Sequence, residues 1–391
     1  MRRFLIGLAG GFASGYLGVR AAQMVGDARE PYAPLAQDPQ RYGRLRRALA
    51  LTGLARSIAE LGFIAYGIAP VVSKGALPES RRRRVAWSVT GLLASALADT
   101  PIAYVEGHVF ERRYALTKQD ARAWLSDQGK GVAVSLALGV PLIELLASAI
   151  ERYPKWWPAL ATVASFPLLV LANVLVPSVI APLFNRFEPL EGPLAERLRA
   201  LAARYGAGDA HILRVDMSRQ TEKANAYVTG VFGSKRIVIG DTLLGPFEER
   251  EVEFVVAHEL GHYLHRDAWR AVGVGTAAAG ALFFGARGLA GRTPGSLAST
   301  NGLARLAFAA TALGIALGPL LAAYSRTRER AADAFAIEAT RDPQAGADAF
   351  RRLRDRNLAE DEQPKWAEVL FATHPSLGSR IRSLEERAAR S

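Results

Sequence analysis

Cysteine is absent from the 391-residue sequence, and acidic residues are in deficit. Without cysteine the protein forms no disulfide and uses no thiol nucleophile, and any metal site has to use nitrogen and oxygen ligands. The 37 acidic residues are outnumbered by 49 basic ones, which gives a net charge of +12. Such a charge also occurs in nucleic-acid-binding proteins, but here the basic residues lie beside apolar segments. We therefore expect the lipid bilayer, and no nucleic acid, as a partner.

Apolar stretches make up much of the sequence: 50% of the residues are hydrophobic, and the mean hydropathy is +0.08. This is too apolar for an ordinary charged globule, so we expect a polytopic membrane protein. One helical crossing needs about 20 apolar residues. Seven segments approach that length: Phe4–Met24, Ala48–Val72, Val85–Tyr104, Gly131–Ile150, Trp157–Leu183, Ala268–Leu289 and Leu303–Tyr324.

Several of these predicted spans carry ionisable residues, among them Arg56, Glu60, Asp99 and Glu144. An ionised group at the bilayer centre costs at least about 2.5–3.5 kcal/mol, so such residues normally face a bundle interior or a water-filled cavity. If the span boundaries are shifted, some of them, Asp99 above all, lie at the membrane interface instead. The first interpretation predicts a helical bundle with a partly polar interior.

The N-terminal segment and the membrane orientation leave alternatives open. Phe4–Met24 follows Arg2 and Arg3 and resembles a signal peptide, but Val19-Arg20-Ala21 is a poor cleavage site, so we expect an uncleaved anchor. The positive-inside rule gives a conflict, because basic clusters lie on both sides of the second span. These clusters are Arg41, Arg44, Arg46 and Arg47 before it, and Lys74 and Arg81 to Arg84 after it.

The pattern His-Glu-x-x-His occurs once, at His258, Glu259 and His262. On an α-helix, residues i and i+4 project from one face, so both imidazoles can bind one Zn²⁺ ion. Zinc with an open coordination position lowers the pKa of a bound water to roughly 7, and Glu259 is placed to accept its proton. Short motifs also recur by chance, but the preceding run from Gly245 to Glu251 predicts a helix start, and Gly261 leaves room for another segment.

Two residues compete to be the third zinc ligand. His265 is close in sequence, but seven residues of helix span roughly 10.5 Å, too far for one ion to bind both His258 and His265. Glu329 comes from a second helical segment and completes the His₂Glu set of thermolysin-like enzymes. Asp333, one turn later, can accept the other ring N–H of a ligating histidine. Taken alone, Glu329 and Asp333 are more typical of a solvated charged helix than of a metal site.

Together, these motifs resemble the integral-membrane zinc metalloproteases of the type 1 CAAX prenyl protease family. The resemblance covers nearly the whole chain, and the shorter HtpX-type membrane proteases share only the core motifs. Its motifs are His-Glu-Leu-Gly-His at 258–262, Ser-Arg-x-x-Glu-x-x-Ala-Asp at 325–333, and the stretches 181–187, 225–230, 236–244 and 373–376.

The resemblance implies further site residues and a topology. It places His374 and Arg380 in the active site, where His374 can donate to the developing oxyanion and Arg380 can pair with a carboxylate. It associates Asn225, Ala226 and Tyr227 with substrate binding, although Asn225 alone is typical of a turn before a strand. It also implies helices around a large hydrated chamber, an outside N-terminus and a cytosolic protease region.

The protease region has the composition of a soluble domain. We predict a helix over Leu190–Tyr205 and strands at Ile212–Val215, Ala226–Phe232 and Arg236–Ile239, the last two joined at Gly233-Ser234 as a hairpin. An exposed strand edge at 225–227 can bind an extended peptide as an added strand. Two more helices are predicted at Ala347–Leu358 and Ile381–Ala389. The expected fold is mainly α, with a thermolysin-like α+β protease region that has a small sheet.

Four segments divide the chain. Residues 1–184 hold spans one to five, 185–267 the edge strand and motif helix, 268–324 spans six and seven, and 325–391 the third-ligand helix and the C-terminal part of the protease region. Since the zinc motifs flank spans six and seven directly, we expect both zinc-bearing helices to continue those spans. The metal then lies near the membrane surface, where it can reach a membrane-tethered substrate.

Two functions from different classes fit the sequence. The first is a zinc endopeptidase that acts on prenylated C-terminal peptides or on unstructured segments of membrane proteins. The second is a non-catalytic zinc-binding scaffold or channel-like protein. Glu259 favours the enzyme, because a structural zinc site needs a fourth protein ligand and no neighbouring base. The Ala-, Gly- and Arg-rich composition suggests a bacterial inner-membrane protein, and bacteria generally lack prenylated CAAX proteins. Membrane-protein quality control is then the expected physiological task.

Overall fold

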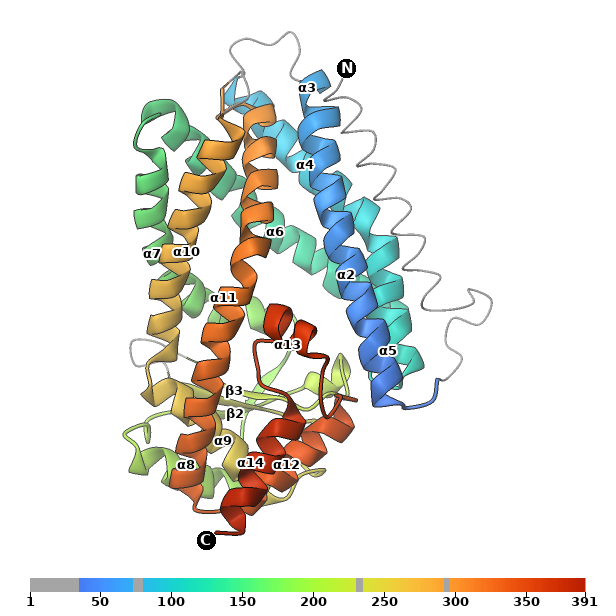
Figure 1. Cartoon of the computed structure of the whole chain (residues 1–391), viewed down its shortest axis with the longest axis vertical. Coiled ribbons are helices and arrows are strands. Elements are labelled where there is room, and N and C mark those ends of the chain that lie inside the picture. The colour runs from blue at the N-terminus through green and yellow to red at the C-terminus, as the bar shows by residue number, and fades with distance from the viewer. Residues whose placement is uncertain (1–34, 73–79, 230–234, 292–295, 391) are drawn as a thin grey trace.

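The computed structural model describes residues 35–72, 80–229, 235–291 and 296–390, and helices dominate it (Figure 1). Within these residues, six helical stretches are long and apolar enough to cross a membrane. They coincide with six of the seven predicted spans, whereas Phe4–Met24 lies outside the described residues. The membrane helices are α2 (Pro39–Phe63), η1 (Ile64–Ile68), α3 (Ala69–Val72), α4 (Arg81–Ala103), η2 (Tyr104–Val109), α5 (Phe110–Arg113), α6 (Ala121–Arg152), α7 (Trp157–Leu175), η3 (Val176–Ile180), η4 (Ala181–Leu183), α10 (Asp267–Ala290) and α11 (Thr300–Thr340).

Each of the four ionisable residues named for the predicted spans has an ion-pair or hydrogen-bond partner. Arg56 on α2 forms an ion pair with Asp99 on α4, and Glu60 accepts a hydrogen bond of 2.8 Å from Ser95. Glu144 on α6 is only 5% exposed and accepts two hydrogen bonds of 3.0 Å from Arg84. The predicted interior position is therefore confirmed for Glu144.

In the described part of the chain, the protease region consists of a four-stranded sheet and five α-helices. These elements are β1 (Phe187–Pro189), α8 (Pro193–Arg204), β2 (His211–Val215), β3 (Ala226–Thr229), β4 (Arg236–Gly240), α9 (Glu249–Leu264), α12 (Pro343–Arg356), α13 (Lys365–Phe371) and α14 (Leu377–Ala388), with a short 3₁₀ turn, η5 (Met217–Arg219). The strand order is β1-β2-β4-β3, and only β2 and β4 pair in parallel. Within the described chain β3 pairs with β4 alone, so β3 is an edge strand.

The predicted strands and helices are largely confirmed, with two additions. The strand predicted at Ala226–Phe232 is described as far as Thr229, and the turn at Gly233-Ser234 lies outside the described residues. The sequence analysis missed the short strand β1 and the helix α13. Figure 1 shows α13 between α11 and α2, above α12 and α14.

Helix α9 lies at the centre of the protease core. Its residue Phe254 is fully buried and packs edge-on against Phe350 of α12, with ring centroids 5.8 Å apart. Gly346 allows this approach, because a Cβ there would lie 2.4 Å from the Phe254 ring. The same core includes Ile237 and Ile239 of β4, so α9 is fixed between the sheet and α12.

The expectation that both motif helices continue membrane spans is wrong for the first. The helix α9 ends at Leu264, and Arg266 has a left-handed backbone with φ of 55° before α10 begins at Asp267. A left-handed residue cannot propagate an α-helix, so the chain turns there. Helix α11, by contrast, runs unbroken from Thr300 to Thr340 and carries Glu329 directly from the predicted span.

Candidate metal centre and catalytic site

Close packing of α9 against α11 brings the two sequence motifs together. A Cβ on Gly261 would lie 3.1 Å from the Ala332 Cα and 3.2 Å from the Phe335 ring. Gly261 therefore lets the backbones approach, as predicted. At the start of α9, the Glu248 N–H donates to the Glu251 side chain at 2.8 Å, which satisfies one of the helix-terminal donors.

His258, His262 and Glu329 present their side-chain donors to one point. Their ligand atoms all lie within 4.8 Å of one another. The two Nε2 atoms are 3.2 Å apart, and each lies 3.4 Å from one oxygen of Glu329. His258 and Glu329 are 6% and 5% exposed, so the cluster is well shielded from bulk water. His265 is not part of this group.

Each of the two histidines also contacts a carboxylate through its other ring nitrogen. The Nδ1 of His258 lies 2.9 Å from Asp333, and the Nδ1 of His262 lies 2.9 Å from Asp267. The sequence analysis proposed Asp333 for this position and missed Asp267. The missed signal was an acidic residue five positions after His262, immediately beyond the helix, where the left-handed Arg266 turns the chain back.

The donor arrangement fits a tetrahedral cation. Metal-ligating imidazoles are neutral, and in that state the Nδ1–H groups that donate to Asp333 and Asp267 leave the lone pair of each ring on Nε2, where both can bind one cation. Two ligands at about 2.0 Å in a tetrahedral shell lie about 3.3 Å apart, close to the separation of these two nitrogens. In addition, Glu329 Oε2 is buried without a hydrogen-bond donor among the described residues. The residues present therefore suit Zn²⁺.

An arginine holds each of the two outer carboxylates. Arg380 of α14 donates to both oxygens of Asp333, at 2.5 and 2.9 Å, and its guanidinium lies 4.0 Å from the centroid of the Phe350 ring. Arg328 donates to Asp267 at 2.8 Å. Both imidazoles are thus oriented by an Arg–carboxylate pair. The structure brings Arg380 to the site, where it pairs with Asp333 rather than with a free carboxylate.

Burial and charge shift the pKa values of the central residues. Burial by itself lowers the pKa of His258, but its hydrogen bonds to Asp333 and Glu329 outweigh this and raise the pKa to about 9. Burial also raises the pKa of Glu259, against the opposing charges of His258 and His262. Glu259 is therefore a stronger base than an exposed carboxylate, as suits a group that accepts a proton near neutral pH.

His374 lies beside the cluster, on the loop between α13 and α14. Its Nε2 is 3.3 Å from Glu329 Oε1, and its Nδ1 is 2.9 Å from the hydroxyl of Thr373. Desolvation first, and then the nearby positive charge of Arg380, lowers the pKa of His374. A neutral His374 whose Nδ1 accepts the Thr373 hydroxyl carries its proton on Nε2, on the side that faces the cluster.

Arg326 anchors this loop to the helix that carries Glu329. Its Nη1 donates to the carbonyl oxygens of Glu368 and Ala372, at 2.8 and 2.6 Å. Ala372 is the C-cap of α13, so the guanidinium satisfies carbonyls at the end of this helix. Glu329 and His374 are thereby held in one relative position, a connection that the sequence pattern did not reveal.

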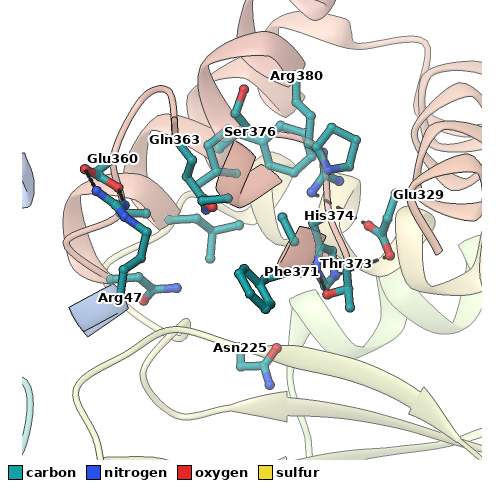
Figure 2. Close-up of a pocket in the computed structure, with 18 of the residues that line it drawn as sticks. Arg47, Asn225, Glu329, Glu360, Gln363, Phe371, Thr373, His374, Ser376 and Arg380 are labelled. Atoms are coloured by element: carbon teal, nitrogen blue, oxygen red, sulfur yellow. Dashed lines mark hydrogen bonds and ion pairs between the residues drawn. The ribbon is translucent and has the colours of Figure 1, made fainter. Parts of the chain in front are cut away.

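The cluster opens into a cavity of about 730 Å³. Figure 2 shows Glu329, His374 and Arg380 at one end of this cavity and Arg47 and Glu360 at the other, with Asn225 and Phe371 between them. Asn225 and Ala226 of the predicted substrate-binding stretch line the cavity, whereas Tyr227 is not among its lining residues. Side chains alternate along a strand, so Tyr227 points to the opposite face of β3 from Ala226.

Comparison with known proteins gives consistent matches. Residues 190–388 match Peptidase family M48, and residues 37–186 match the CAAX prenyl protease N-terminal region, described as five membrane helices. The metalloprotease YhfN of Bacillus subtilis is 28% identical over 75% of this chain and 71% of its own length. A CAAX prenyl protease 1 homolog of Oryza sativa is 31% identical over the same shares. The crystal structure of S. mikatae Ste24p has the same fold, with a TM-score of 0.75 at 24% identity, covering 98% of this chain and 97% of that one.

Proposed function

Because the chain belongs to peptidase family M48 and is a membrane zinc metalloendopeptidase of the CAAX prenyl protease type, we propose that His258, His262 and Glu329 are its zinc ligands. The observation that carries this proposal is the pair of imidazole Nε2 atoms 3.2 Å apart, with both Nδ1 atoms on carboxylates. When bound, zinc supplies a Lewis acid that polarises the substrate carbonyl and makes a water molecule acidic.

Glu259 is the general base of the proposed reaction. It follows His258 directly on α9 and lines the same cavity, so an attacking water beside the cluster is within its reach. Glu259 accepts the proton from this water and later delivers it to the leaving amine. The peptide bond breaks by direct attack of water, and no covalent enzyme intermediate forms.

His374, Arg380 and Asp333 support this step from the other side. The Nε2–H of His374 faces the cluster and can donate to the oxygen of the scissile carbonyl as negative charge develops on it. Asp333 and Arg380 do not contact the substrate in this proposal. They orient the His258 ring and keep its Nε2 lone pair directed at the metal position.

The edge strand β3 provides the substrate with a backbone template. An extended peptide can pair with the free edge of β3, and the exposed amide of Asn225 can bind its backbone. Ala226 leaves space for the peptide, while Tyr227 supports the strand from the opposite face. The proposed substrate-binding residues are therefore Asn225 and Ala226, with Tyr227 in an indirect role.

A non-catalytic zinc scaffold explains this geometry less well. A structural zinc site is closed by four protein ligands, whereas three residues form the group in the described part of the chain. A large cavity with a carboxylate base beside the cluster has no use in such a scaffold. The relatives and the family model named above are likewise those of proteases.

The substrate and cellular setting are also part of the proposal. The enzyme is a multi-pass membrane protein, and we place it in a bacterial inner membrane with residues 185–267 and 325–391 on the cytosolic side of segments 1–184 and 268–324. Its helices surround a hydrated chamber, and its task is the quality control of membrane proteins. Prenyl-peptide cleavage is a capability shared with the CAAX prenyl protease 1 relatives.

A peptide comparison tests this function. The purified protein in detergent is given a prenylated peptide, the same peptide without the prenyl group, and an unfolded segment of a membrane protein, with Glu259→Gln as the blank. We expect the wild type to cut the unfolded segment and the blank to cut nothing. Absence of any wild-type cleavage in a zinc-loaded sample would contradict the enzyme. The rate ratio of the first two peptides shows whether the prenyl group is recognised.

A further inference from the structure

A groove on the outside of the helical bundle lies between α7 and α10, apart from the catalytic cavity. Figure 1 shows these two helices side by side, with the start of α7 and the end of α10 directed away from the sheet. The groove encloses about 800 Å³, and all its lining residues except Thr276 of α10 are apolar. Of the residues that α7 contributes, Leu160, Val163 and Phe166 are 43%, 71% and 46% exposed. Both helices are candidate membrane spans, so the groove faces lipid.

Close helix packing gives the groove a fixed shape. Gly280 of α10 faces Thr162 of α7, and a Cβ on Gly280 would lie 3.0 Å from the Thr162 Cγ2. At the start of α7, Trp157 is 1% exposed and packs edge-on against Phe283 of α10, with ring centroids 6.1 Å apart. The preceding residue, Trp156, is 69% exposed and lines the groove instead of the helix interface.

The length of the groove corresponds to one leaflet of a bilayer. Its lining extends along α7 from Trp156 to Pro167, which corresponds to about 16.5 Å of helix. On α10, Arg287 follows Thr276 at the same spacing, and about three helical turns place both residues on one face. Half of the hydrocarbon core of a bilayer is about 15 Å thick, and tryptophan is typical of the membrane interface. Trp156 therefore marks the headgroup end of the groove.

Basic side chains gather at this headgroup end. Lys155 directly precedes Trp156, and the guanidinium of Arg287 donates to the Lys155 carbonyl oxygen at 2.7 Å. Arg152, at the end of α6, holds its guanidinium 5.8 Å from the centroid of the Tyr153 ring. The turn between α6 and α7 and the last turns of α10 thus bring three positive charges to one end of an apolar groove.

The nearby negative charge is used elsewhere. Glu151 forms an ion pair with Arg84 at 2.6 Å. Within the described residues, no carboxylate forms an ion pair with Arg152, Lys155 or Arg287. These three side chains are therefore available to an anion at the membrane interface.

We propose that the groove between α7 and α10 is a binding site for an anionic phospholipid. One acyl chain lies in the groove from Trp156 toward Pro167, and the phosphate is bound by Arg287 and Lys155, with Arg152 beside them. A zwitterionic lipid carries the same phosphate, but its ammonium group adds to the positive charge already present, so the anionic lipid binds more tightly. This site goes beyond the proposed proteolysis, and it lies in the leaflet remote from the sheet.

Two lipids with the same acyl chains test the headgroup site, phosphatidylglycerol and phosphatidylcholine. Native mass spectrometry of the detergent-purified protein during titration measures their dissociation constants. We expect one phosphatidylglycerol per chain, bound at least about tenfold more tightly than phosphatidylcholine. A basic residue near the membrane surface contributes about fivefold to such binding. Lys155→Gln with Arg287→Gln should therefore weaken phosphatidylglycerol binding about 25-fold and abolish the preference.

The charge control is Arg82→Gln with Arg83→Gln. These residues lie at the start of α4, at the same end of the membrane helices as the Arg84–Glu151 pair, but they do not line the groove. This variant should keep the lipid preference. Equal binding of both lipids by the wild type, or an equal loss in the control, would overturn the headgroup site. Displacement of the lipid by inorganic phosphate at constant ionic strength would also overturn it, because the site would then bind the free anion.

The apolar part of the site has its own test. Ala164→Phe fills the groove and should weaken phosphatidylglycerol binding about tenfold. Ala172→Phe adds the same ring at an exposed position of α7 outside the groove, and it should bind the lipid like the wild type. Unchanged binding by Ala164→Phe, or an equal loss in Ala172→Phe, would show that no acyl chain lies in the groove. Because lipid binding is measured directly, neither result depends on proteolytic activity.

Discussion

At the residue scale, each of the two histidines of the proposed metal centre is oriented by one Arg–carboxylate pair. His258 is oriented by Asp333 and Arg380, and His262 is oriented by Asp267 and Arg328. The carboxylates keep the ring protons on Nδ1, and the arginines hold the carboxylates in place. The four charged residues beside the two histidines are therefore two carboxylates that orient the rings and two arginines that hold the carboxylates.

We predict that Asp267→Asn lowers the zinc affinity about 10- to 100-fold, since the loss of such an outer carboxylate typically has this effect. Competition with a chelator of known affinity measures the change. Asp209→Asn, which removes an exposed carboxylate paired with Lys235, should leave the affinity unchanged. An unaltered affinity in Asp267→Asn would show that the contact with His262 does not support the ligand.

Zinc uptake should be coupled to proton release. In the metal-free protein the pKa of His258 is raised to about 9, so at pH 7 this ring carries the additional proton. Zinc needs the neutral ring, so binding expels the proton, and the apparent affinity should rise about tenfold per pH unit between pH 7 and 9. Calorimetry at pH 7.5 in two buffers of different ionisation heat should find at least one proton released per zinc. No proton release would contradict a protonated His258.

At the scale of elements, the function depends on how three helices are held against one another. Gly261 lets α9 approach α11, and Arg326 of α11 binds the C-terminal end of α13. The loop after α13 carries His374. Thus α11 positions Glu329, the proposed third ligand, together with helix α13 and the loop that carries His374, the proposed oxyanion donor.

We predict that Arg326→Ala lowers kcat about tenfold with zinc still bound, because the His374 loop loses two hydrogen bonds of about 1 kcal/mol each. Arg326→Lys should recover part of the rate, since an ammonium can also donate to these carbonyls. Arg330→Ala, one turn later on an exposed face, is the control. Equal kcat in Arg326→Ala and wild type would separate Arg326 from the active site.

Sequence patterns predicted the features that depend on neighbouring residues along the chain. They missed the features that depend on contacts between distant residues. Helix periodicity alone predicts that His258 and His262 lie on one helix face. Hydropathy located six spans that the structure describes. The break at Arg266 could not be predicted, because arginine rarely adopts a left-handed backbone without tertiary support. Asp267 was missed as well, because it reaches His262 only through this turn at Arg266. The helix α13 is seven residues long, too short for a periodic signal.

At the scale of the whole molecule, the protease region and the membrane helices share one cavity. Its walls come from α2 of the membrane region and from α9, α11, α12 and α13 with their adjoining loops. Leu51, Leu54 and Arg47 of α2 close the cavity on one side, so neither region forms the cavity alone. Six candidate membrane helices in the described part of the chain and the His258–His262–Glu329 cluster fit hydrolysis in a space sheltered from bulk solvent.

The most direct test of this account measures zinc content and peptide turnover in the same samples of purified wild type and Glu259→Gln. Both should bind one zinc per chain, because the substitution leaves His258, His262 and Glu329 intact. Turnover by Glu259→Gln should fall by about 10²- to 10⁴-fold, since glutamine cannot accept a proton. Normal turnover by a zinc-loaded Glu259→Gln protein would show that Glu259 is not the base and would contradict the central claim.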